Sequence, residues 1–462
     1  MRNFKVRALV GLLLLCGLTS CHITRPGGAP AASLAGLYRD QVATDTVTLA
    51  QLPWRTLFTD PALQTLIAQG ITHNLDLQVA GARVREADAY FRQSQAAFLP
   101  SLSATGSVAR SRQAGSSELG TLRATTFYQL YGSASWEADV WGKLRNSRRS
   151  YLALLLQSEA YRRAVQTSVV AGIANYYYQL LALDQQLAIT RQTVQNRIQD
   201  VETSRKLSAA GIVTGAAVVQ SEAIRYAAEV TIPDLKQQIR ETENALSRLL
   251  GVAPAAIGRG TLAAQQPVTT LSTGVPAQLL RFRPDVQQAE YAFRSAFALT
   301  NAARAYFYPA LTLTASGGYS AFDFSQLLDP TAVFGSLAGG LVQPLLTRGV
   351  NRARLRVSEA QQLEAQLNFQ TALLTAGQEV SDALYSYQAA EEKITIRARQ
   401  LDALQKSVTY SQALLANGFA NYTEVLTAQQ NLLTAQLNGV SDQQQRLQAV
   451  TNLYRALGGG WQ

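Results

Sequence analysis

The feature that most constrains the fold is an internal duplication that runs through most of the chain. A motif containing Phe98 and Pro100 recurs 209 residues later at Phe307 and Pro309. Farther along, the offset becomes 207, as shown by Ser204 and Ser411, Leu207 and Leu414, Ala209 and Ala416, Gly211 and Gly418, and Val218 and Val425. Chance matches would not keep one offset over such long stretches. Units of about 200 residues are too long for a solenoid repeat, so the duplication indicates two copies of one large hairpin.

Each copy contains a long stretch that favours one continuous helix. The first stretch runs from Gly142 to Gly211 and the second from Gly349 to Gly418. Neither stretch contains proline, and both are rich in the helix-favouring residues Leu, Ala, Gln, Glu and Arg. A helix of about 70 residues would be about 100 Å long, which is typical of a coiled coil and not of a globular core.

The residues after each long stretch predict a helix end, a tight turn and a returning helix. Left-handed glycines are expected where the long helices end, and polar N-caps where the next helices begin: Gly211, Thr214, Gly418 and Asn421. The returning helices are expected to end at Leu250–Gly251 and Leu457–Gly458. Pro233 interrupts only the first of them, since the second copy has no proline there.

Ahead of the long helical stretches, the spacing of apolar residues changes to a period of two. The alternation covers residues 102–108, 128–140 and 311–319, whereas residues 333–341 are rich in glycine and alternate less clearly. Strands of about ten residues with one apolar face and one face of small polar side chains are typical of transmembrane β-barrels. Tyr128, Trp136, Trp141 and Tyr319 are candidates for the aromatic residues at the membrane interface. The alternative is a soluble antiparallel sheet with one solvated face.

Four strands are too few to close a barrel, and an unpaired strand edge in lipid is unfavourable. The known barrels begin at about eight strands. We therefore expect the chain to oligomerise through its strands, with three copies supplying twelve. The predicted fold class is mainly α with a membrane β-barrel portion, in which four strands per chain complete a 12-stranded barrel above a long α-helical tunnel.

The N-terminus has the pattern of a bacterial export signal that ends in a lipobox. Three basic residues precede an apolar run from Ala8 to Gly17, which is too short to span a bilayer. Leu18-Thr19-Ser20 then leads directly to Cys21. We expect residues 1–20 to be a signal peptide and Cys21 to be diacylated, and two acyl chains are enough for stable anchoring. The alternative is an ordinary signal peptide cleaved elsewhere, with Cys21 incidental.

Composition argues against nucleic-acid binding, metal chemistry and catalysis. The formal net charge is +10, but the basic residues are scattered and only 16% of residues are charged. The chain has two cysteines, Cys16 inside the signal and the lipidated Cys21, so no disulfide framework and no zinc site is expected. His22 and His73 lie far apart in the sequence. There is no phosphate-binding loop and no catalytic constellation, so we expect no cofactor, no metal and no enzyme activity.

Five short motifs occur along the chain: DPAL at 60–63, HNLDL at 73–77, LLRFRPDV at 279–286, YP at 308–309 and LYRALGGGW at 453–461. Together they resemble the motifs of the TolC-type outer-membrane factors, and most closely those of the OprM and NodT lipoprotein branch. The resemblance spans about residues 54–462. It implies a homotrimer in the outer membrane, anchored by lipid, with its helices in the periplasm. It also implies two protein partners, a periplasmic adaptor and an inner-membrane efflux transporter.

The pattern predicts six parts of the chain. After the signal peptide comes an anchored extension at 21–60, and then periplasmic helices at 61–99 and 142–308 that belong to the first repeat. Strand pairs are expected at 100–141 and 309–348, and the helices of the second repeat at 349–462.

At the tips of the helical hairpins, the resemblance implies both a gate and the docking surface for the adaptor. Gly211, Thr214, Gly418 and Asn421 mark the docking tips. Relatives close the tunnel with inward carboxylates just after the tip glycines. Glu424 matches one such position, whereas Thr427 and Ala217 stand where the family commonly has Asp. We expect Glu424 and Thr427 to line the pore; the alternative is that they lie on a solvated outer face.

The predicted function is that of a passive exit duct for small toxic compounds or drugs, driven by an inner-membrane pump. Two rivals stay open at the level of the sequence. One is the outer-membrane duct of type I protein secretion, and the other is a non-porous coiled-coil lipoprotein.

Overall fold

A computed structural model describes residues 36–38, 48–113, 123–266, 273–274 and 276–462. The chain divides into two compact units. The sheet unit contains the described residues of 84–158 and 289–369, and the helical unit contains those of 32–83, 159–288 and 370–462. The expected signal peptide and Cys21 lie outside the described residues.

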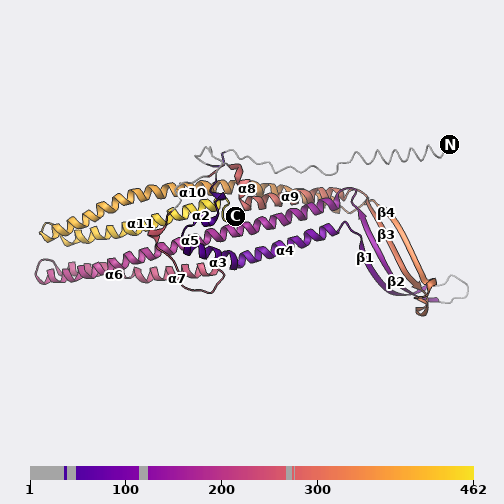
Figure 1. Ribbon diagram of the computed structural model, residues 1–462, viewed down its shortest axis with the longest axis horizontal. Coiled ribbons are helices and arrows are strands. Elements are labelled where there is room, and N and C mark those ends of the chain that lie inside the picture. Colours follow the sequence, from indigo (N-terminus) through magenta and orange to yellow (C-terminus); the bar gives the residue numbers. More distant parts are fainter. Residues whose placement is uncertain (1–35, 39–47, 114–122, 267–272, 275) are drawn as a thin grey trace. The chain divides into compact units, whose positions relative to one another are not determined.

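The described residues form the elements labelled in Figure 1. The helices are α2 (Trp54–Leu57), α3 (Pro61–His73), α4 (Leu75–Ala96), α5 (Lys143–Ala209), α6 (Gly215–Glu229), α7 (Thr231–Leu249), α8 (Leu279–Phe282), α9 (Pro284–Ala305), α10 (Val350–Ala416) and α11 (Tyr422–Ala456). The strands are β1 (Ser101–Gln113), β2 (Arg123–Ala138), β3 (Ala310–Ala321) and β4 (Val333–Val342). Five 3₁₀ turns are η1 (Leu49–Gln51), η2 (Leu262–Ala264), η3 (Pro276–Gln278), η4 (Phe324–Gln326) and η5 (Pro330–Ala332).

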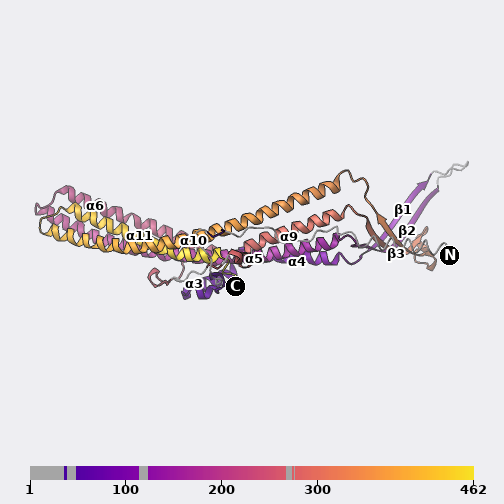
Figure 2. The ribbon, with the colours of Figure 1, turned by 90° about the horizontal axis from the view of Figure 1, so that it is seen from above.

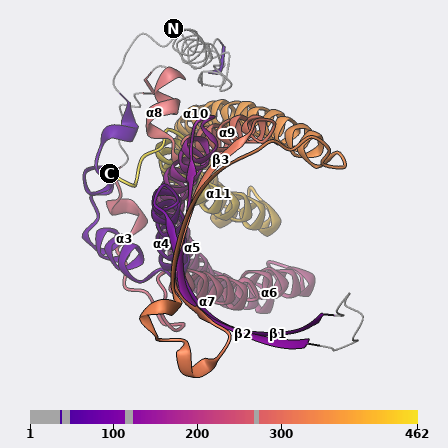
Figure 3. The same ribbon diagram turned by 90° about the vertical axis from the view of Figure 1, so that its right-hand side faces the viewer.

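The sheet unit contains one antiparallel sheet in the order β1-β2-β3-β4. Its register places apolar residues opposite apolar residues: Leu130 pairs with both Gly106 and Tyr319, and Leu337 pairs with Ala315. The other face carries small polar side chains, and the Ser103 hydroxyl lies 2.8 Å from that of Ser133. The period-two alternation therefore separates an apolar face from a polar face, as predicted. The sheet is curved, as Figure 3 shows.

The first strand pair ends earlier than the alternation predicted. The prediction continued to Val140, but β2 ends at Ala138 because the Asp139 carboxylate caps the next helix. It accepts hydrogen bonds from the backbone N–H groups of Leu144 and Arg145, both at 2.9 Å. A carboxylate at a helix start satisfies free N–H groups and stabilises the helix dipole.

The helical unit is built from two hairpins, in agreement with the duplication. The long helices α5 and α10 have 67 residues each. The second returning helix, α11, is continuous over 35 residues, whereas the first is divided at Val230 into α6 and α7. Pro233 stands in the first turn of α7, where its missing N–H group leaves no helical hydrogen bond unmade. Figures 1 and 2 both show α11 beside α10.

Polar bonds link α11 to both long helices. Asn175 of α5 donates to Asn452 at 3.1 Å, and Arg397 of α10 forms an ion pair with Asp442 at 3.0 Å. Hydrogen bonds between buried or half-buried side chains fix the register of packed helices, because a shift would leave the polar groups unsatisfied.

Two of the sequence motifs meet at the end of α11. The Trp461 indole donates to the carbonyl of Phe282 at 3.0 Å, and the buried Arg283 guanidinium donates to the carbonyl of Ala456 at 3.0 Å. Arg283 also forms ion pairs with Asp285 and Glu379. Gly458 lies against the Phe282 carbonyl and has φ +92°, so a side chain there would be both strained and obstructed. The LLRFRPDV and GGGW segments therefore close the helical unit together.

No helix among the described residues is both long enough and apolar enough to cross a bilayer.

Candidate functional site

Both hairpin tips use the helix ending that the glycines predicted. Gly211 and Gly418 have φ of +73° and +76°. After each glycine, the next backbone N–H turns back to a carbonyl of the last helical turn: Ile212 donates to Leu207 and Phe419 to Leu414, both at 2.9 Å. These bonds satisfy carbonyls that the helix leaves free. Figures 1 and 2 place both tips at one end of the helical unit.

The two predicted N-caps behave differently. The Asn421 side chain accepts a hydrogen bond from the Glu424 backbone N–H at 3.1 Å and so caps α11. Thr214 occupies the N-cap position of α6, but within the described chain its side chain makes no capping bond. There the first turn closes through the Thr214 carbonyl, which accepts from the Ala217 N–H at 3.0 Å.

Glu424 and Thr427 are exposed on the first turns of α11. The Thr427 hydroxyl donates to the carbonyl of Thr423 at 2.8 Å, so it is satisfied within its own helix. Asn431, one turn farther along, is exposed too. The helix begins at Tyr422, so this exposed row of side chains starts at Glu424 and not earlier in the tip. The acidic position therefore lies on an open surface beside the tip.

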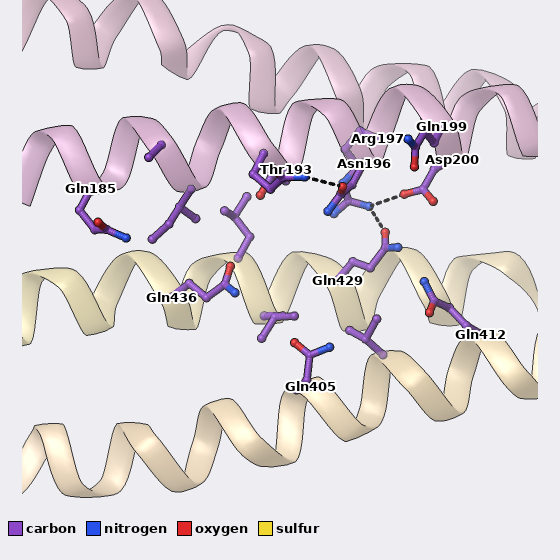
Figure 4. A pocket seen from close by; sticks show the side chains of 16 residues that line it. Gln185, Thr193, Asn196, Arg197, Gln199, Asp200, Gln405, Gln412, Gln429 and Gln436 are labelled. Atoms are coloured by element: carbon purple, nitrogen blue, oxygen red, sulfur yellow. Dashed lines mark hydrogen bonds and ion pairs between the residues drawn. The ribbon is translucent and has the colours of Figure 1, made fainter. Parts of the chain in front are cut away.

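A polar groove of about 600 Å³ runs between α5, α10 and α11 behind the tips. Figure 4 shows that its labelled side chains are glutamines and other polar residues from all three helices. The glutamines are Gln185, Gln192, Gln199, Gln405, Gln412, Gln429 and Gln436. Neutral amides both donate and accept, so such a wall binds water well without carrying net charge.

A buried arginine closes one part of this groove. The Arg197 side chain is 2% exposed; it donates to the Gln429 amide oxygen at 2.5 Å and lies 4.0 Å from the Asp200 carboxylate (Figure 4). Burial lowers the pKa of Arg197 and raises the pKa of Asp200, while their mutual attraction opposes both shifts. The Tyr422 hydroxyl adds a hydrogen bond to the Asp200 carbonyl at 3.0 Å. This cluster joins the first copy to the start of α11.

Sequence reasoning missed the Arg197 cluster. With the offset of 207, Arg197 corresponds to Leu404, so the duplication gives no sign of a charge here. The available signal was a charged residue within an otherwise helix-forming stretch, and such residues are usually on solvated faces.

The sheet is the second candidate region. Its apolar face leaves large side chains exposed, including Leu102 at 80% and Leu337 at 74%. Among the described residues, β1 and β4 each have a strand neighbour on one side only. An exposed apolar face combined with two open edges marks a surface that another chain or a membrane covers.

Comparison with known proteins decides the family. The family described as "Outer membrane efflux protein" matches residues 66–252 and 275–459, which is most of the chain. The chain belongs to the outer membrane efflux protein family.

Curated relatives cover nearly the same length. The antibiotic efflux pump outer membrane protein ArpC of Pseudomonas putida is 30% identical over 452 residues, which are 96% of this chain and 93% of ArpC. The pyoverdine export outer membrane protein OpmQ of Pseudomonas putida is 31% identical, covering 99% of this chain and 98% of OpmQ. The cation efflux system protein CusC of Escherichia coli K12 is 29% identical, with 88% of each chain covered.

Solved structures share the fold. A membrane protein from Pseudomonas aeruginosa has a TM-score of 0.88 at 27% identity, covering 96% of this chain and 98% of its own. Crystal structures of CusC, which describe folding and transmembrane channel formation, give a TM-score of 0.86 at 27% identity over 95% of this chain and 100% of CusC.

This outer membrane efflux protein is therefore a channel subunit of an efflux system in the outer membrane, with its helices in the periplasm. The comparisons confirm the predicted family, function, location and fold class. They do not reach the predicted site residues. Cys21 lies outside the described residues, and Glu424, Thr427 and the four tip residues stay predictions.

Proposed function

We propose that three copies of this chain close one 12-stranded barrel, in which β1 of each copy pairs with β4 of the next. The observation that carries this proposal is the four-stranded sheet with two open edges and one apolar face. In a bilayer each unsatisfied backbone group costs on the order of several kcal/mol, so open edges in lipid must find partners. Pairing β1 with β4 removes every edge at once.

The resulting duct conducts passively and catalyses no reaction. The polar face of each sheet supplies the lining of the barrel, and the paired hairpins continue the passage into the periplasm. An inner-membrane efflux transporter supplies the energy, and a periplasmic adaptor joins it to the hairpin tips at Gly211, Thr214, Gly418 and Asn421. The relatives named above serve an antibiotic pump, a cation efflux system and pyoverdine export. One fold that serves such different cargo supports a duct whose substrates, small toxic compounds or drugs, are chosen by the pump.

The proposal assigns an anchor and a gate. The signal at 1–20 is removed, Cys21 carries the lipid and 21–60 connects it to the helices. The first repeat then supplies helices at 61–99 and 142–308 around the strand pair at 100–141. The second supplies the strand pair at 309–348 and helices at 349–462.

Glu424 and Thr427 line the periplasmic mouth. The support for this gate is the exposed position of both side chains just after the tip glycine.

Mass and conductance measured on one purified sample test the proposal. Detergent-purified protein with intact β signal should have the mass of a trimer and should form discrete channels in planar bilayers. A monodisperse monomer would refute the shared barrel. A trimer without single-channel conductance would favour the non-porous spacer and refute the duct.

A further inference from the structure

The connection between β3 and β4 folds back over the apolar face of the sheet. Figure 3 shows it on the outer, convex side of the curved sheet. The Phe324 ring contacts the Tyr128 ring, with 5.6 Å between the ring centroids. Between this connection and the strands lies a groove of about 560 Å³, lined by Gly106, Ser107, Val108, Tyr128, Gln129, Leu130, Phe324, Ser325, Leu327 and Leu328.

The lining of this groove is suited to hydrocarbon. Its floor is formed by the apolar face of β1 and β2, where Val108 and Leu130 are 66% and 47% exposed. Its wall is formed by Phe324, Leu327 and Leu328, and Leu328 is 71% exposed. The volume lies within the usual range for small-ligand sites. Apolar side chains left open in this way are stabilised when an apolar occupant covers them.

Two short caps hold the wall in place. The Asp323 carboxylate accepts hydrogen bonds from the backbone N–H and the hydroxyl of Ser325, at 3.0 and 2.8 Å. The Asp329 carboxylate does the same for Thr331, at 2.9 and 2.7 Å. These Asx turns fix the backbone on both sides of Leu327 and Leu328, so the groove is formed before anything binds.

The cationic side chain of Arg110 lies at the position that the head group of a bound lipid would occupy. Arg110 follows Val108 by two positions in β1, so it lies on the same face, about 7 Å farther along the strand. That direction leads from the start of β1, which follows the end of α4, toward the far end of the strand. Arg110 is exposed, and a guanidinium binds phosphate oxygens in a bidentate manner. The groove and the cation are therefore arranged in the order of an acyl chain and a phosphate.

We propose that this groove is a lipid-binding site, which takes an acyl chain of a phosphate-bearing lipid of the outer leaflet and binds its phosphate through Arg110. The groove is continuous with the apolar face that meets the bilayer, which favours lipid over a soluble ligand. The proposal rests on the outer-membrane location of the chain and not on conduction, so it can fail while the duct stands.

Native mass spectrometry of the purified protein, mixed with bisphosphorylated lipid A or with dephosphorylated lipid A, tests the site. The double variant Leu327→Ser/Leu328→Ser removes the wall, and Leu337→Ser is its matched control on the apolar face outside the groove. We expect the double variant to bind lipid A about tenfold more weakly and the control to bind as wild type does. Arg110→Gln should abolish the preference for the bisphosphorylated form, whereas Arg399→Gln on α10 should not.

Three outcomes would overturn the proposal. Equal binding by the double variant and Leu337→Ser would show only a nonspecific lipid coat. An unchanged phosphate preference in Arg110→Gln would remove the head-group contact. Loss of the oligomer in the double variant would assign the groove to a neighbouring copy of the chain. Leu328 is largely exposed and Leu327 is half-buried on a surface loop, so the variants should fold, and an unchanged β signal checks this.

Discussion

Arg197 shows how one residue joins the two copies of the duplicated unit. It is buried on α5, and its contact with Gln429 reaches the beginning of α11. Removing one partner of a buried guanidinium leaves the other polar group buried without a hydrogen bond. The free-energy cost of breaking this contact is therefore mainly the cost of that unsatisfied group.

Arg197→Leu introduces the residue type that stands at the corresponding position of the second copy. The substitution should destabilise the contact between α5 and α11 by about 1–3 kcal/mol, because it leaves buried polar atoms unsatisfied. Hydrogen exchange of the α11 amides would report the loss. The double variant Arg197→Leu/Gln429→Leu should recover part of it, whereas exposed Arg399→Leu should change little. Equal protection in Arg197→Leu and wild type would show that the cluster is not a stabilising link.

The proposed role of Glu424 also depends on a single side chain, because one carboxylate would be repeated three times around the pore axis of the trimer. Glu424→Gln should lower the cation-to-anion permeability ratio by about twofold or more, since rings of charge set potentials of at least the order of kT in a narrow pore. Reversal potentials across a salt gradient in planar bilayers measure this ratio. Glu392→Gln, exposed on α10, is the matched control. If both variants keep the wild-type ratio, Glu424 lies on an outer face.

At the scale of the elements, the second tip shows that the backbone conformation at a helix end can be tested separately from side-chain packing. A Cβ atom at Gly418 would meet nothing within 4 Å, so only its φ of +76° opposes a side chain. Gly439, inside α11, would place its Cβ 3.5 Å from Arg397, which is an ordinary contact.

Gly418→Ala should therefore destabilise the second tip by about 1–2 kcal/mol, because a left-handed conformation is unfavourable for alanine. Gly439→Ala should be neutral or stabilising by up to about 1 kcal/mol, because alanine favours a helix interior. Hydrogen exchange of the amides of residues 410–425 would distinguish the effects of the two variants on the stability of the tip. Equal protection of the tip in both variants would mean that the left-handed position does not limit its stability.

Periodicity and glycine spacing were enough to predict the long helices, their ends and the strand faces. They were not enough for features made by contacts between distant residues. The Arg197 cluster depends on which helix faces which, and β2 ends at Ala138 because Asp139 bonds forward to α5. The alternation of apolar and polar residues along each strand does not predict that residues 322–332 fold back over the sheet.

At the scale of the whole molecule, the proposed lipid anchor decides where the protein resides. Cys21→Ser should abolish labelling by a palmitate analogue and leave the precursor unprocessed or mislocalised, because acylation requires the thiol. Cys16→Ser is the matched control, since residue 16 lies in the expected signal and its loss should leave the label intact. Label retained on the Cys21→Ser protein would end the lipoprotein assignment.

The order of the strands also bears on how the chain reaches its native state. The strands of each pair are near neighbours in sequence, but β2 and β3 are not. The Trp141 indole, three residues after β2, donates to the carbonyl of Pro309, which directly precedes β3 and lies 168 residues later. Closing a loop that long costs about 2–3 kcal/mol more than closing a ten-residue one, so the central pairing forms late unless the helices first bring its ends together. Each strand pair can form locally as soon as it is synthesised or exported. The periplasmic hairpins then act as an internal template, and a variant that slows their assembly should delay membrane insertion while leaving the final trimer unchanged.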